Sequence, residues 1–123
     1  MHHSDSYAYH KGLQGEKEAE AYLCAQGMTC IAKRYHSPYG EIDLIMLDDE
    51  VLVFAEVKAR SHRSLQDAQT TVTPAKQRKI IQTALCFLSE YPEYADRLMR
   101  FDIIALSDDC IQHVPDAFQG SAW

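Results

Sequence analysis

Hydrophobic positions follow a helical period in two parts of the chain. Apolar residues recur three and four positions apart from about Tyr9 to Gln26, and again from Pro74 to about Tyr91. Gly27 provides a stop for the first helix, and Thr73 provides an N-cap hydroxyl directly before the proline that opens the second. The pattern therefore predicts two helices separated by a long β-rich segment.

Five further segments have the composition of β-strands. They are rich in β-branched, aromatic and aliphatic residues and span 29–34, 41–47, 51–60, 100–106 and 110–114. Both faces of the second strand are apolar, with Ile42, Leu44 and Met46 on one face and Ile45 and Leu47 on the other. Because such a sheet must be covered on both sides, we expect an α/β fold in the order α-β-β-β-α-β-β, a central mixed sheet flanked by helices.

The second and third strands are separated by a short acidic turn and predict a hairpin. A connection with an even number of residues, centred on this turn, places Asp43 opposite Glu56 and Glu41 opposite Lys58. Facing residues have Cβ atoms about 4.5 to 5.5 Å apart, and a bulge would change the pairing. Because side chains alternate along a strand, Glu56, Lys58 and Arg60 are predicted to share one face.

Two carboxylates at that separation in a sheet covered on both faces repel each other and are costly to desolvate. One interpretation is a half-buried salt-bridge cluster in which Lys58 neutralises Asp43 and Glu56. The other is a divalent ion, Mg²⁺ or Mn²⁺, held by those carboxylates, the carbonyl of Val57 and waters. In that case Lys58 would orient a metal-activated water or offset charge that develops on phosphorus.

Two acids of the first helix fall in its apolar stripe, because Glu16 and Glu20 project among Leu13, Ala19 and Leu23. A carboxylate at a core-facing position needs a reason. Either both acids lie at the edge of the stripe and reach water or an arginine, or one of them points into an active-site cleft.

The spacing of these acidic residues resembles a known nuclease motif. Asp43 followed by Glu56-Val57-Lys58 is similar to the D…ExK core of the PD-(D/E)xK nuclease superfamily, with Ile42 where the proline of the motif would stand. More closely, four segments resemble the YraN-type family of small bacterial proteins, which is related in fold to archaeal Holliday-junction resolvases. These segments are Gly40-Glu41-Ile42-Asp43-Leu44-Ile45, Glu56-Val57-Lys58-Ala59-Arg60, Arg100-Phe101-Asp102 and His113-Val114-Pro115-Asp116-Ala117-Phe118.

The resemblance covers residues 12–118 and carries expectations about the fold and the site. It implies a restriction-endonuclease-like αβββαβ core with catalytic carboxylates on the second and third strands. It also implies that Glu16 lies near the metal and that Lys76 reaches a phosphate. Gln77, which projects from an apolar helix face, is expected to position the residues of the site. Glu41 is expected to do the same.

The net charge of −6 argues against a polyanionic partner, but the charge is unevenly distributed. Residues 58–79 contain only one acid, Asp67, and carry Lys58, Arg60, Arg63, Lys76, Arg78 and Lys79. This segment either binds nucleic acid or forms the solvated start of a basic helix. Residues 61–72 lack any periodicity and predict a mobile loop beside the site, which includes His62.

Two polar residues in the C-terminal strands have structural interpretations. Asp102 lies between apolar neighbours and is expected to form a structural ion pair, with Arg60 as one candidate partner if that arginine does not clamp a phosphate. His113 near the end of the last strand is expected to be a packed or capping histidine.

At 123 residues the chain predicts one domain, 1–123, with flexible tails at 1–8 and 119–123. It has no apolar run of about 20 residues and opens without the pattern of a signal peptide. Four scattered cysteines without metal-ligand spacing are expected to be small core residues in a reducing compartment. These features predict a cytoplasmic protein without a membrane segment.

Together the residues and the resemblance favour a Mg²⁺- or Mn²⁺-dependent endonuclease that hydrolyses phosphodiester bonds in DNA, with branched or damaged DNA as substrates by analogy with the resolvases. A symmetric homodimer would suit cutting of two strands. One alternative is a non-catalytic nucleic-acid-binding module of a repair or recombination complex. A second alternative, favoured by the net charge, is a protein-interaction scaffold.

Overall fold

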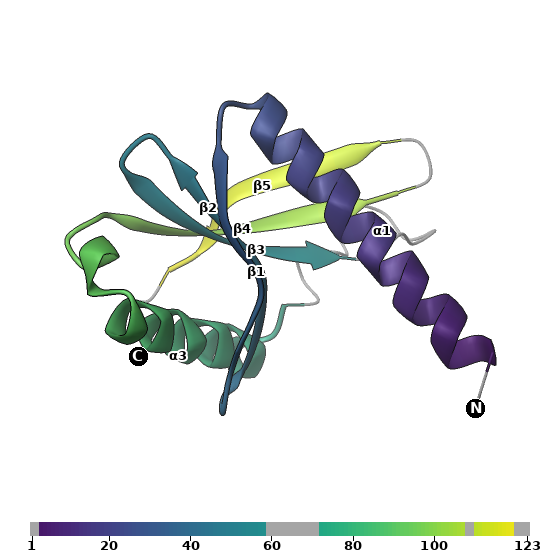
Figure 1. The fold of residues 1–123 in the computed structure, drawn as a ribbon, viewed down its shortest axis with the longest axis horizontal. Helices are drawn as coiled ribbons and strands as arrows, with labels where there is room; N and C mark the ends of the chain where they lie inside the picture. The colour runs from purple at the N-terminus through teal and green to yellow at the C-terminus, as the bar shows by residue number, and fades with distance from the viewer. Residues whose placement is uncertain (1–2, 59–71, 108–109, 120–123) are drawn as a thin grey trace.

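A computed structural model of the chain describes residues 3–58, 72–107 and 110–119, and the side chains of residues 3–12 lie outside this description. Within these residues, five strands form one mixed sheet in the order β1-β2-β3-β4-β5 (Figure 1). The elements are α1 (His3–Ala25), β1 (Thr29–Ser37), β2 (Gly40–Asp48), β3 (Val51–Lys58), α3 (Pro74–Glu90), a 3₁₀ turn η1 (Pro92–Tyr94), β4 (Met99–Leu106) and β5 (Ile111–Phe118). The predicted mixed α/β architecture and element order are confirmed.

The helix ends follow the sequence patterns closely where a cap defines them. Gly27 has φ of 98° and its N–H binds the Cys24 carbonyl, while the Met28 N–H binds the Leu23 carbonyl, which is a Schellman arrangement. At the start of α3 the Thr73 side chain accepts from the Lys76 N–H. α1 begins at His3 instead of Tyr9, within the residues expected to form a tail.

The last strand continues beyond the predicted end at Val114, to Phe118. Pro115 lies within this extension and has no N–H to donate, which restricts it to a position where no partner is needed. The strand order places β5 at one edge of the sheet, where only one side of the strand needs partners. The β4–β5 register also shifts between Phe101 and Ile103, and Asp116 has φ of 52°, so an irregularity accommodates the extra residues.

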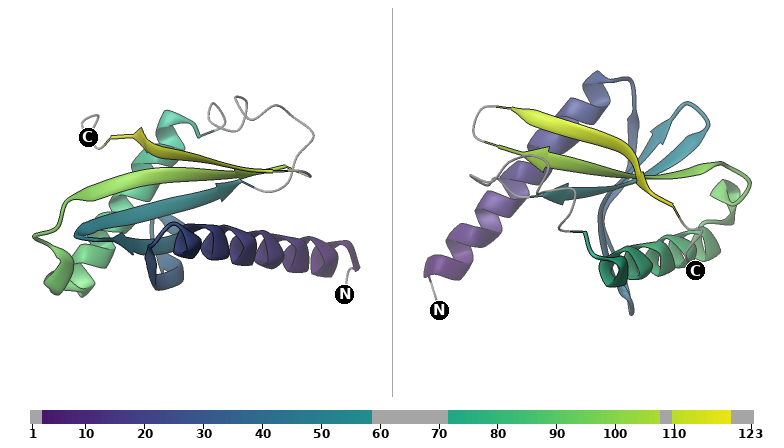
Figure 2. Two further views of the ribbon diagram at one scale, coloured as in Figure 1. Left: turned by 90° about the horizontal axis from the view of Figure 1, so that it is seen from above. Right: turned by 180° about the vertical axis from the view of Figure 1, so that it is seen from behind.

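Each face of the sheet is covered by one of the two described helices (Figure 2). One core cluster joins the α3 residues Ile80, Ile81, Ala84 and Phe87 to the sheet. The other joins α1, through Ala19 and Leu23, to the opposite sheet face. The expectation that the sheet is covered on both sides is therefore confirmed.

The second strand changes face in its middle. Ile42 packs in the α3 cluster, whereas Leu44, two residues later, packs in the α1 cluster. A regular strand would put both residues on one face, so the predicted grouping of Ile42 with Leu44 is wrong. The neighbouring β1 residue Arg34 has φ of 51°, and the register passes from Lys33–Leu44 to Tyr35–Ile42 across it. Asp43 lies at this irregular point.

The predicted hairpin register is confirmed where the strands pair. Five pairs run from Asp48 opposite Val51 to Leu44 opposite Ala55, and Asp49 adopts φ of 53° in the turn. β3 then pairs in parallel with β4, the arrangement produced by a crossover through a helix. The C-terminal end of β3 and the first turn of α3 consequently meet at one place. Neither of the described helices has the length and apolar character required to cross a membrane.

Candidate active site

Two carboxylic acids meet where the β2–β3 ladder ends. The side chains of Asp43 and Glu56 are hydrogen-bonded to each other, and Glu56 is only 8% exposed. The N–H of Val57 donates to Asp43 Oδ2 at 2.8 Å. A side-chain oxygen thus takes the place of a β2 carbonyl just beyond the last paired residues. The predicted proximity of Asp43 and Glu56 is confirmed.

Burial and mutual repulsion set the protonation of this pair. Burial, the hydrogen bond to Glu56 and the repulsion between the two groups raise the pKa of Asp43 to about 9, although the Val57 N–H acts in the opposite direction. Burial by itself would raise the pKa of Glu56, but the hydrogen bond from Asp43 and the nearby Lys76 bring it below its ordinary value. At neutral pH the pair therefore holds one proton, on Asp43, and one negative charge, on Glu56.

Lys76 neutralises the remaining charge, and Lys58 lies beside it. Lys76 Nζ lies 3.0 Å from Glu56 Oε2, and the Lys58 side chain is close enough to Lys76 for each to shift the pKa of the other. Burial and the neighbouring Lys76 lower the pKa of Lys58. Burial opposes the charge on Lys76, but its contacts with Lys58 and with the Glu56 carboxylate raise its pKa overall. Lys58 belongs to the cluster as expected, yet the ion pair with Glu56 is made by Lys76.

The first turn of α3 positions Lys76. Thr73 Oγ1 accepts from the Lys76 N–H at 3.2 Å, which fixes the backbone at this residue. The Gln77 side chain donates to the Val72 carbonyl at 2.9 Å and so fastens the chain that leads into the helix. Gln77 thus acts on the backbone before α3. Arg78 and Lys79 are exposed on the same turn.

The acids of α1 pair with β1. Arg34 binds Glu16 through two contacts, Nε to Oε1 at 2.8 Å and Nη2 to Oε2 at 3.2 Å, and Lys33 Nζ lies 2.9 Å from Glu20 Oε1. Of the two earlier interpretations, these contacts fit the one in which both acids lie at the edge of the apolar stripe, where they reach a basic residue. Glu16 is nevertheless near enough to Asp43 to contribute to its raised pKa.

Other predicted site residues lie away from the carboxyl pair or outside the description. Glu41 lies beyond the end of the β2–β3 ladder and has its carboxylate 3.8 Å from His36 Nδ1, so the predicted pairing of Glu41 with Lys58 is not formed. Arg60 and Arg63, together with His62 and the rest of the predicted loop before Val72, fall outside the described residues.

Across residues 3–58, 72–107 and 110–119, no three His, Cys, Asp or Glu side chains gather closely enough to hold an ion by themselves. The four cysteines are free thiols; Cys24 and Cys110 are exposed, and the other two are half-buried. The expectation that the cysteines are small core residues is wrong for Cys24 and Cys110, whereas Cys30 packs against the cluster beneath α1.

A second buried acid has a different environment. Asp102 is fully buried and accepts from Arg100 Nε at 2.9 Å, Arg100 Nη2 at 3.0 Å and the Asp116 N–H at 3.0 Å, with His113 Nε2 at 2.6 Å. The predicted structural ion pair of Asp102 is confirmed, with Arg100 as its partner. His113 is packed against Tyr22 as well as bonded to Asp102.

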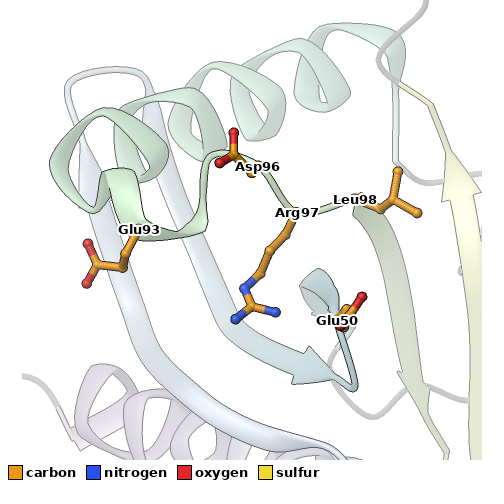
Figure 3. Close-up of a pocket in the computed structure, with 5 residues that line it drawn as sticks. All are labelled: Glu50, Glu93, Asp96, Arg97 and Leu98. Carbon is orange, nitrogen blue, oxygen red and sulfur yellow. The ribbon is translucent and has the colours of Figure 1, made fainter.

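A separate pocket opens near the start of β3, whereas the carboxyl pair lies near the end of that strand. Its volume is about 280 Å³, and it is lined by Glu50, Glu93, Asp96, Arg97 and Leu98 (Figure 3). It shares no residue with the cluster of Asp43, Glu56, Lys58 and Lys76. The pocket and the cluster are therefore separate features of the surface.

Sequence reasoning missed the two partners that complete the acidic cluster, Lys76 for Glu56 and Arg34 for Glu16. For Lys76 a signal was present, because a lysine in a helical first turn that contains no acid lacks a favourable local partner. For Arg34 no local signal exists. Its contact depends on the packing of α1 beside β1, which brings together residues eighteen positions apart.

This chain is similar in sequence to known proteins along most of its length. Residues 15–106 match the family described as "Uncharacterised protein family UPF0102". A UPF0102 protein from Rhodopseudomonas palustris is 42% identical over 115 residues, which cover 93% of this chain and 84% of that protein. Relatives from Bradyrhizobium diazoefficiens (41% identical, covering 93% and 85%) and Alcanivorax borkumensis (42% identical, covering 84% and 82%) carry the same family name. The expected YraN-type relationship is confirmed, and the chain belongs to the UPF0102 family.

Proposed function

We propose that this protein is a metal-dependent nuclease that hydrolyses phosphodiester bonds in DNA. The observation that carries the proposal is the buried pair of Asp43 and Glu56, which shares one proton beside two lysines. A purely structural use of two acids would be expected to give each its own donors. Here the two acids share a proton, and a metal cation can take the place of that proton between them.

The donors of the pair fit a hard divalent ion, Mg²⁺ or Mn²⁺. Loss of the Asp43 proton would give two adjacent carboxylates, and the Val57 carbonyl faces the same side, because the N–H and C=O of one strand residue point in one direction. Glu16 would join this set by releasing Arg34 and binding the ion in its place. When bound, the ion would polarise the scissile phosphate and lower the pKa of a bound water.

The protein's own basic groups have separate roles in this proposal. Lys58, with its lowered pKa, is placed beside Glu56 to orient the attacking water or to offset charge that develops on phosphorus. Lys76, Arg78 and Lys79 on the first turns of α3 would hold the DNA backbone, as would Arg60 and Arg63. A homodimer would present two such sites for cutting two strands.

Cleavage of labelled linear, flapped and four-way DNA in Mn²⁺ tests the proposal. Asp43→Ala and Glu56→Ala are expected to reduce cleavage at least about a hundredfold, as loss of a principal electrostatic group does in other enzymes. Glu41→Ala is the matched control, since it removes an acid from the same strand outside the cluster. Cleavage that persists in the Asp43 and Glu56 variants would refute the assignment.

A non-catalytic nucleic-acid-binding module is the second candidate. It is favoured by the ion pair of Lys76 with Glu56 and the proton on Asp43, which leave the pair neutralised without a metal. DNA binding by the wild type without cleavage would support this candidate. If the protein neither binds nor cuts DNA, the negative net charge favours the scaffold hypothesis.

A further inference from the structure

Lys76 has an unfavourable place in its own helix. It stands in the first turn of α3, three residues after the N-cap Thr73, and no acidic residue lies in that turn. Positive charge near a helix N-terminus opposes the helix dipole. The ammonium group therefore depends on an acid from elsewhere, and Glu56 on β3 provides it at 3.0 Å.

A divalent ion at Glu56 would remove that partner. The Lys76 ammonium contacts the carboxylate that the ion requires, and Lys58 already brings a second ammonium group against Lys76. An ion with two positive charges would be repelled by both lysines at a separation of a few ångströms. Lys76 is the group that can leave, because its side chain is 45% exposed, whereas Lys58 is half-buried.

We infer that Lys76 is a tethered cation that occupies Glu56 until a divalent ion displaces it, and that the displaced ammonium then binds a phosphate of the substrate. This inference rests on the proposed function. It makes Lys76 a competitor of the metal in the free protein and a ligand of DNA in the metal-bound protein. Metal and DNA should consequently strengthen each other's binding. The metal frees Lys76 from Glu56 to bind a phosphate, and a phosphate bound to Lys76 leaves Glu56 available to the metal.

The affinity for Mn²⁺ without DNA tests the competition directly. It is measured by electron paramagnetic resonance on the wild type, Lys76→Gln, Lys76→Arg and Lys79→Gln. Lys76→Gln is expected to bind Mn²⁺ roughly three- to tenfold more tightly, the order expected when one charge a few ångströms from a divalent ion is removed in a solvent-accessible site. Lys76→Arg should retain an affinity close to that of the wild type, because it keeps the charge.

Lys79→Gln is the matched control. It removes the same charge from an exposed position three residues along the helix and should leave the affinity for Mn²⁺ nearly unchanged. An unchanged or weaker affinity in Lys76→Gln would overturn the inference, as would equal tightening in Lys79→Gln. Asp43→Ala separates the two proposals. If the wild type binds Mn²⁺ through Asp43 but Lys76→Gln binds no more tightly, only the inference fails, whereas absence of Mn²⁺ binding in every protein refutes both.

Binding of a cleavage-resistant phosphorothioate duplex tests the second half of the inference. Fluorescence polarisation should show that Mn²⁺ strengthens DNA binding of the wild type more than that of Lys76→Gln. An equal gain in both proteins would show that the displaced ammonium does not bind the phosphate.

Discussion

Two buried acids on one sheet, Asp102 and Asp43, differ in how their oxygens are satisfied. Both oxygens of Asp102 receive two donors each, from Arg100, His113 and the Asp116 backbone. Asp43 receives one backbone N–H and otherwise faces another carboxyl group. The acid whose two oxygens are both supplied with donors links β4 to β5 through His113 and the Asp116 backbone. Asp43, which has fewer donors, keeps a proton that it would lose when a cation binds. This difference separates a structural acid from one that is available for chemistry.

The satisfied acid is expected to carry the larger share of stability. Asp102→Ala leaves the His113 ring without its carboxylate partner and the Arg100 guanidinium with only its 3.4 Å contact to Asp48. The free energy of unfolding should therefore fall by about 3–5 kcal/mol. Chemical denaturation followed by circular dichroism measures this loss. Asp48→Ala is the control, because it removes a half-exposed partner of the same arginine at 3.4 Å and should cost no more than about 1 kcal/mol. Equal losses in the two variants would contradict the comparison.

Asp43 should reveal itself through the dependence of stability on pH. Its pKa is raised in the folded protein to about 9, while the unfolded chain has the ordinary value of 3.8. Between these values the folded state holds a proton that the unfolded state has released, so this group's contribution to stability is complete below about pH 4 and is lost as the pH rises toward 9.

Asp43→Asn cannot ionise and should remove this dependence. The free energy of unfolding of the variant, relative to the wild type, should rise with pH by at most about 1.4 kcal/mol per pH unit in metal-free buffer. Denaturation series between pH 5 and 9 measure the slope, with Glu41→Gln as an exposed control. Parallel slopes for wild type and Asp43→Asn would show that Asp43 is ionised in the folded protein. The comparison with Asp102 would then lose its basis.

Much of the fold was readable because local rules agreed with one another. The turn Asp49-Glu50 has an even number of residues, so the register that places Asp43 beside Glu56 followed from the hairpin itself. Thr73 and Pro74 predicted the start of α3, and Gly27 predicted the end of α1. In each case the chemistry of one or two neighbouring residues determined the structure.

The site was less predictable because its contacts are long-range. The ion pair of Lys76 with Glu56 depends on how α3 packs against the sheet, and that of Glu16 with Arg34 depends on the position of α1. The change of face at Ile42 occurs beside Arg34, a residue of the neighbouring strand with a positive φ. None of these features has a periodic signature, so the sequence identified the acids but not the basic residues that hold them.

The smallest expected change in stability would decide to which system Glu16 belongs. Glu16→Gln removes one charge from a half-exposed pair with Arg34, so the free energy of unfolding should change by less than about 1 kcal/mol. If Glu16 exchanges Arg34 for the metal, the same variant should weaken Mn²⁺ binding by about tenfold. Glu20→Gln, which breaks the neighbouring pair with Lys33, is the matched control and should leave Mn²⁺ affinity unchanged. An unaltered affinity in Glu16→Gln would assign Glu16 to the same structural class as Asp102, leaving Asp43 and Glu56 as the two acids that a cation would bind.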